Sequence, residues 1–176
     1  MPYPFYTIGH STRTINEFVA LLQTADVERV IDIRTIPKSR TNPQYNEDVL
    51  PDNLAPFGIG YKLIPELGGL RHKSKEVADD VNGFWNNQSF HNYADYALSD
   101  DFQSGLAELI KQGHKQVCAI MCSEAVWWRC HRRIVADYLL ARGEQVFHLM
   151  GQDKVNPATL TSGAKITDNK RVVYPT

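Results

Sequence analysis

The 176-residue chain has little of several features, and each shortage excludes a class of protein. Its three cysteines are few and odd in number, which excludes a disulfide framework and predicts free thiols in a reducing compartment. No apolar run approaches the roughly 20 residues that a transmembrane helix needs, so no membrane partner is expected. The net charge of −1 argues against a broadly basic nucleic-acid-binding surface but is compatible with a local basic pocket.

The composition that remains is that of a folded domain. Hydrophobic residues make up 43 % and charged residues 22 % of the chain, an ordinary globular balance, and the length suits one domain. A strand-like segment begins at Phe5, which leaves no room for a targeting peptide, so we expect a cytoplasmic protein. Nothing in the pattern indicates an oligomeric state.

Five short apolar runs alternate with helical segments along the chain. The runs occupy residues 5–8, 29–33, 59–64, 117–121 and 145–149. Helices are expected after a Thr14–Glu17 capping box, from Ser99 or Asp100 to Gln112, and from His131 to a stop at Gly143. The alternation predicts a single α/β domain over residues 1–150, with a mainly parallel sheet of about five strands flanked by helices. Residues 151–176 form a polar C-terminal tail, either flexible or lying across the surface.

Polar and ionic residues lie at or just after the ends of four of the apolar runs. These residues are His10 and Ser11, Asp32 and Arg34, Glu66 to Arg71 with the Gly68–Gly69 pair, and Cys122 with Glu124. Ligands of parallel sheets bind beyond the carboxyl ends of the strands. Unpaired buried charges cost several kcal/mol, so this recurrence is hard to assign to packing. We therefore expect His10 and Cys122 to share one site at the carboxyl edge.

Each of these features also has a purely structural explanation. His10 can donate a hydrogen bond to a backbone carbonyl, and Asp32 with Arg34 can form a structural ion pair. The two glycines, Gly68 and Gly69, suit a turn that requires positive φ. The sequence leaves these alternatives open.

The segment from Met121 to Arg133, MCSEAVWWRCHRR, concentrates basic residues where a helix begins. Arginines at a helix N-terminus are unfavourable by roughly 0.3–1 kcal/mol each unless an anion compensates them. We expect Arg132 to face the site, because apolar residues share its side of the helix, and Arg133 to pair with Asp137 on the surface. The segment therefore predicts an anion site, with phosphate as the anion.

The thiols of this segment allow several interpretations. Cys122 follows a strand and lies near arginines, which predicts a lowered pKa and faster alkylation than at Cys118. A metal site would use Cys122, Cys130 and His131, but their spacing matches no common zinc pattern, so we predict no metal and no required cofactor. A redox pair and two inert structural thiols also remain open.

The motifs TIGHS, DIR followed by PKSR, LGG with Arg71, Cys122-x-Glu124 and Cys130-His131-Arg132 occur in this order. With them the chain resembles the family called domain of unknown function 488 over roughly residues 6–150. The resemblance implies signature positions at His10, Ser11, Asp32, Arg34, Ser39, Gly68, Gly69, Arg71, Cys122, Glu124, Cys130, His131 and Arg132. One departure is Cys-Ser-Glu where the family often has Cys-Ala-Glu. The family name confers no activity, although labels on some members mention DNA repair, a hint towards nucleic acid.

These features together predict an enzyme that acts on a phosphorylated substrate, such as a nucleotide or a nucleic-acid component. Arg34, Arg71 and Arg132 would bind the anion, with Ser11, Ser39, Gly68 and Gly69 around it. The candidate catalytic residues are His10, Asp32, Cys122 and Glu124, and the roles of Cys130 and His131 stay open. One alternative is a non-catalytic module that binds a nucleotide or nucleic acid. Another is a thiol-redox or metal-binding protein that uses Cys122, Cys130 and His131.

Overall fold

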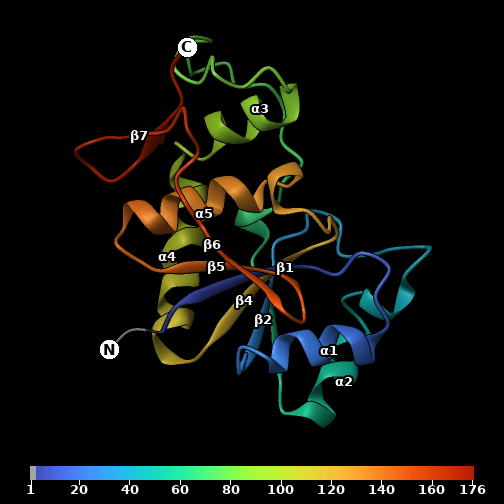
Figure 1. The fold of residues 1–176 in the computed structure, drawn as a ribbon. Coiled ribbons are helices and arrows are strands. Elements are labelled where there is room, and N and C mark those ends of the chain that lie inside the picture. Colours follow the sequence, from blue (N-terminus) through green and yellow to red (C-terminus); the bar gives the residue numbers. More distant parts are fainter. Residues whose placement is uncertain (1–2) are drawn as a thin grey trace.

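A six-stranded sheet runs through the centre of the protein in the computed structural model, which describes residues 3–176 (Figure 1). Its strands are β1 (Phe5–Gly9), β2 (Arg29–Asp32), β3 (Gly60–Leu63), β4 (Cys118–Cys122), β5 (Val146–Gly151) and β6 (Lys154–Pro157). They lie in the order β3-β2-β4-β1-β5-β6. The first five are parallel and β6 pairs antiparallel with β5, so the predicted α/β class is confirmed.

Helices cover both faces of the sheet (Figure 1). The helices α1 (Ile15–Gln23) and α2 (Leu50–Leu54) pack on one face, and α4 (Asp100–Lys115) and α5 (Arg132–Ala141) on the other. Side chains of β4 alternate between these two cores, with Met121 facing α1 and Ile120 facing α5. Within residues 3–176, no helix is both long and apolar enough to span a membrane.

Local signals in the sequence account for several element boundaries. The capping box of α1 forms as predicted, because Thr14 Oγ1 accepts from Glu17 N and Glu17 Oε1 accepts from Thr14 N. Helix α4 starts after its Ser99 cap and continues to Lys115, beyond the predicted end at Gln112. Two helices were not predicted, α2 and α3 (Gln88–Tyr96), since the polar residues around them lack a clear apolar period. Short 3-10 helices occupy Pro43–Tyr45, Ala55–Phe57, Pro65–Leu67 and Trp127–Arg129.

The order of the strands brings three strand ends together. Strand β4 lies between β1 and β2, with Gly9 paired to Cys122 and Asp32 paired to Met121. The segments that follow these strands all leave the sheet at its carboxyl edge, on the right in Figure 1. Residues placed just after β4 therefore lie between those that follow β1 and those that follow β2.

The C-terminal segment packs against α5. After β6 it forms the hairpin of β7 (Lys165–Ile166) and β8 (Val172–Val173), and then it buries Tyr174 completely. The Tyr174 hydroxyl donates to Asp137 Oδ2 at 2.7 Å. Asp137 was predicted to pair with Arg133 at the surface, and this is wrong. Its carboxylate is 1 % exposed and accepts from Tyr174 and from Thr161 N, whereas Arg133 donates to Thr161 Oγ1.

We expect Tyr174→Ala to lower the free energy of unfolding by about 3–5 kcal/mol, because it empties an aromatic site in the core. Tyr174→Phe should lower it by about 1–3 kcal/mol, since Asp137 loses one of its donors. Tyr3→Ala is the matched control: this tyrosine is 42 % exposed, so its loss should change stability by less than about 0.5 kcal/mol. Urea unfolding measures all three. Equal effects at Tyr174 and Tyr3 would contradict the packing of this segment into the core.

Candidate functional site

A pocket of about 580 Å³ opens at the carboxyl ends of β1, β2 and β4, and we refer to it as the strand-end pocket. Among the predicted residues it is lined by His10, Arg34, Ser39, Gly69, Cys122, Glu124, Cys130 and His131. His10 N donates to Cys122 O at 2.9 Å, so the predicted neighbourhood of His10 and Cys122 is present. Ser11, Asp32, Gly68, Arg71 and Arg132 do not line this pocket.

Asp32 and Arg34 form a buried ion pair beneath one wall of the pocket. Arg34 Nε donates to Asp32 Oδ1 at 2.9 Å, and Arg34 Nη2 donates to Oδ2 at 2.7 Å. Asp32 also accepts from the Tyr61 hydroxyl at 2.5 Å and has no exposed surface. The carboxylate of Asp32 thus has its acceptor positions occupied, while Arg34, 6 % exposed, extends to the pocket lining.

His10 presents an unprotonated nitrogen to Arg34. Its Nδ1 lies 2.9 Å from the carbonyl oxygen of Ser11, which can only accept, so Nδ1 carries the hydrogen. Its Nε2 therefore accepts from Arg34 Nη1 at 3.4 Å. The ring stacks on Tyr45 with centroids 4.2 Å apart. Burial lowers the pKa of His10, and the Arg34 charge adds to this, so the imidazole is neutral near pH 7.

Arg132, which the sequence predicts to bind the anion, is completely buried and does not line the strand-end pocket. Its Nη1 donates to Cys122 Sγ at 2.7 Å and to Glu124 O at 2.5 Å. Its Nη2 donates to Ala125 O at 3.1 Å, and its Nε donates to Thr7 Oγ1 at 3.1 Å. The guanidinium lies under the 123–129 loop, where it supplies hydrogen-bond donors to the carbonyls of Glu124 and Ala125. It therefore supports the floor of the pocket from below and does not line the pocket.

The two thiols of the pocket lie against each other. Cys130 Sγ is 2.7 Å from Cys122 Sγ and 3.5 Å from His131 Nδ1. Burial raises the pKa of Cys122, which corrects the predicted lowering at this residue. The pKa of the Cys130 thiol is lowered instead. Burial opposes its ionisation, but the hydrogen bond with Cys122 and the charge of Arg132 outweigh the effect of burial. The thiol with the lowered pKa is thus the one at the start of the helix and not, as the sequence predicts, the one at the end of the strand.

The glycine pair is required by close packing and not by positive φ. Within residues 3–176, only Gly58 and Gly143 among the glycines have positive φ. A Cβ on Gly68 would lie 2.7 Å from Thr35 Oγ1, and one on Gly69 would overlap the His131 ring. Gly69 therefore allows His131 to reach Ile33 O, to which its Nε2 donates at 2.9 Å.

Three further predicted residues lie outside the pocket. Arg71 stacks over the Tyr96 ring at 3.7 Å and donates to Gly68 O and Pro65 O, so its predicted role in anion binding is not supported by its position. Glu66 is exposed and does not line the pocket. Ser11 contributes only its backbone: its carbonyl accepts from His10, and its amide donates to Ser123 O.

Two cationic residues of the pocket were missed as ligands, Lys38 and Arg129. Both side chains are exposed, and within residues 3–176 neither forms an ion pair. Their signals were present in the sequence, because Lys38 lies in PKSR and Arg129 in the basic segment before α5. Phe90 and Asn87, from the start of α3, also line the pocket, and no sequence signal linked that segment to the site.

The residues proposed for the metal alternative do not converge as ligands. Among residues 3–176, no group of three or more His, Cys, Asp or Glu side chains is arranged to hold a metal ion. The Nε2 atom of His131 is taken by Ile33 O, which leaves Nδ1 facing Cys130. The alternative of a metal centre on Cys122, Cys130 and His131 thus has no geometric support.

The family model that describes Domain of unknown function DUF488 matches residues 14–139. The chain belongs to this family. The match includes Asp32, Arg34, Cys122 and Cys130 and begins after the TIGHS segment, so His10 lies outside it. No curated protein and no solved structure matches the chain. The description of the DUF488 family assigns no activity to it.

A buried histidine that no sequence motif indicates, His148, lies behind the pocket floor. His148 Nδ1 is 2.6 Å from Thr7 Oγ1, and its ring stacks on Trp127 at 4.6 Å. Thr7 Oγ1 accepts from Arg132 Nε and still has its own hydroxyl hydrogen, which it can donate to the unprotonated Nδ1 of a neutral His148. Burial, together with the Arg132 charge, lowers the pKa of His148 to about 3.

We expect the free energy of unfolding to fall as the pH is lowered from 7 to 5. Unfolded His148 takes up a proton near pH 6.5, but the folded protein resists protonation until about pH 3. Between these two pH values, His148 lowers the free energy of unfolding by about 1.4 kcal/mol for each pH unit of acidification. The pKa values of His10 and His131 are also lowered, so these residues act in the same direction. Urea unfolding across this range measures the slope. His148→Gln should reduce it, and a stability that rises on acidification would contradict the assignment.

Proposed function

We propose that the protein is an enzyme that acts on a phosphorylated substrate of the nucleotide or nucleic-acid-component class in the strand-end pocket. The observation that carries the proposal is the charge of the lining. Among the lining residues that the structure describes, three are cationic, Arg34, Lys38 and Arg129, and one, Glu124, carries a carboxylate. Lys38 and Arg129 supply the net positive charge, since Asp32 already neutralises Arg34.

The size and the apolar part of the pocket also suit a nucleotide. Its volume of about 580 Å³ falls within the range of small-molecule sites. Phe90, Ile36 and Leu70 line it, and the latter two are 63 % and 69 % exposed. Exposed apolar side chains beside free cations favour a ligand that combines a flat ring with an anion, as a nucleotide does.

The proposed site contains residues that take part in proton transfer and residues that hold other side chains in place. His10 is the proposed general base, because Nε2 of its neutral ring carries a lone pair at the pocket. To take the substrate's proton, Nε2 has to give up the hydrogen bond that it accepts from Arg34 Nη1. Glu124, whose side chain is exposed at the pocket, is the proposed second acid or base. Asp32 positions Arg34, since its oxygens are occupied and it has no exposed surface. Ser39 lines the site beside Lys38.

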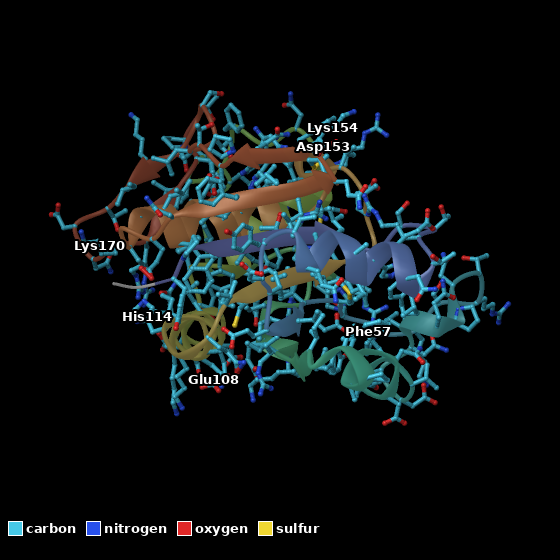
Figure 2. All side chains as sticks on the ribbon, turned by 60° about the horizontal axis from the view of Figure 1, so that its bottom comes forward. Phe57, Glu108, His114, Asp153, Lys154 and Lys170 are labelled. Atoms are coloured by element: carbon cyan, nitrogen blue, oxygen red, sulfur yellow. The ribbon has the colours of Figure 1, made fainter. Side chains whose placement is uncertain are left out.

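We expect Arg129→Ala and Lys38→Ala each to weaken binding of a nucleoside monophosphate by about 1.5–3 kcal/mol, as for a lost charge-assisted contact. The matched controls are Arg142→Ala, at the far end of α5, and Lys170→Ala, which Figure 2 shows beyond the opposite ends of the strands. Calorimetric titration with nucleoside monophosphates and with inorganic phosphate measures the effect. Equal losses in all four variants would indicate non-specific electrostatics and contradict the site.

We expect His10→Asn to reduce turnover by about 10²–10⁴-fold while nucleotide binding persists, because only the proton transfer is removed. The measurement is a screen of phosphate esters, nucleosides and oligonucleotides with the wild-type protein, followed by kinetics of the variant on any substrate found. Tight nucleotide binding without turnover of any of the three substrate classes would contradict the proposal of an enzyme and support the alternative of a non-catalytic binding module.

A further inference from the structure

The buried charge of Arg132 has no carboxylate to balance it. The guanidinium is 0 % exposed, and among residues 3–176 it forms no ion pair. Its partners are the hydroxyl of Thr7, the carbonyls of Glu124 and Ala125, and the sulfur of Cys122. Arginine cannot lose its proton in a protein, and an uncompensated buried charge is costly. Of these partners, only the thiol can become an anion.

The neighbouring thiol shares this environment. Cys130 Sγ lies 2.7 Å from Cys122 Sγ and accepts from the backbone N of Arg132 at 3.4 Å, in the first turn of α5. A helix N-terminus and an adjacent guanidinium both stabilise a thiolate. One negative charge held by the two sulfurs therefore balances Arg132, and the second sulfur retains a proton.

His131 provides a proton acceptor beside this pair. Its Nε2–H donates to Ile33 O, so Nδ1 bears the lone pair, 3.5 Å from Cys130 Sγ. Cys122 and Cys130 are only 3 % and 6 % exposed, but both line the strand-end pocket. A reagent of a few non-hydrogen atoms can reach them, whereas a bulky protein disulfide cannot.

We propose that Cys130 and Cys122 form a redox-active dithiol that small hydroperoxides oxidise to a disulfide, with Cys130 as the attacking thiolate and Cys122 as the resolving thiol. The proposal does not depend on the proposed anion-binding function. The two sulfurs are already in contact, so closing the bond to about 2.05 Å needs little backbone movement.

The chemistry balances without a further oxidant. The Cys130 thiol first loses its proton to solvent by way of His131 Nδ1. The thiolate attacks the terminal oxygen of the hydroperoxide, the O–O bond breaks, and the alkoxide takes a proton back from solvent and leaves as the alcohol. Cys130 is then a sulfenic acid. The Cys122 sulfur attacks the Cys130 sulfur, and the hydroxyl leaves as water with the Cys122 proton. Two thiols and one hydroperoxide thus give one disulfide, one alcohol and one water, and a low-molecular-weight thiol reverses the oxidation.

The test uses the wild-type chain, with Cys118 as an internal control. This third thiol is completely buried within β4, and burial raises its pKa to about 12. Stoichiometric hydrogen peroxide should remove the Cys122 and Cys130 thiols, lower the mass by about 2 Da and join their two peptides in a non-reduced digest, about tenfold or more faster than Cys118 is modified. Dithiothreitol should restore both thiols.

Two variants assign the roles within the pair. In Cys122→Ser, Cys130 should stop at a sulfenic acid that dimedone traps, and in Cys130→Ser the rapid reaction should be lost. Circular dichroism shows whether each variant folds. If a variant does not fold, the non-reduced digest of the wild-type protein still shows whether the disulfide forms. Oxidation of Cys118 at the same rate, sulfinic acid at Cys130 without a disulfide, or survival of all three thiols would overturn the proposal.

Discussion

The burial of one guanidinium, that of Arg132, is the constraint on which the rest of the site depends. It connects the middle of β1 through Thr7, the end of β4 through Cys122, and the loop after β4 through the carbonyls of Glu124 and Ala125. A buried cation requires acceptors on every side, so these segments can adopt only the arrangement that supplies them. The floor of the pocket is the surface that results.

The Asp32–Arg34 pair sets the opposite wall in a comparable way but with the charge balanced. There the carboxylate neutralises the guanidinium, and His10 stays uncharged beside them. At the floor, the balancing charge has to come from sulfur. The lining therefore contains two sets of residues with different proposed roles, the cations Lys38 and Arg129 for a phosphorylated ligand and the thiols Cys122 and Cys130 for redox chemistry. The two proposals can be tested separately because they use different residues.

Much of the fold was predictable, because the signals for it are local. The apolar runs predict the five parallel strands, and the capping box predicts the start of α1. The location of the site was predictable, because residues after parallel strands meet at one edge of the sheet. The contacts of its individual side chains were less predictable. Arg71, Arg132 and Arg133 all carry the same charge in the sequence, yet one stacks on Tyr96, one is buried and one reaches Thr161.

The sequence by itself determined the α/β class, the parallel strands and the concentration of polar residues at their carboxyl ends, since each of these follows from period, caps and chain order. Only the tertiary structure decided which cations are free and which thiol is activated. Those properties depend on burial and on contacts between residues far apart in the chain, as between Thr7 and His148 or Gly69 and His131. A charge in a sequence has no partner until the fold supplies one, and its solvation and partners set its chemistry.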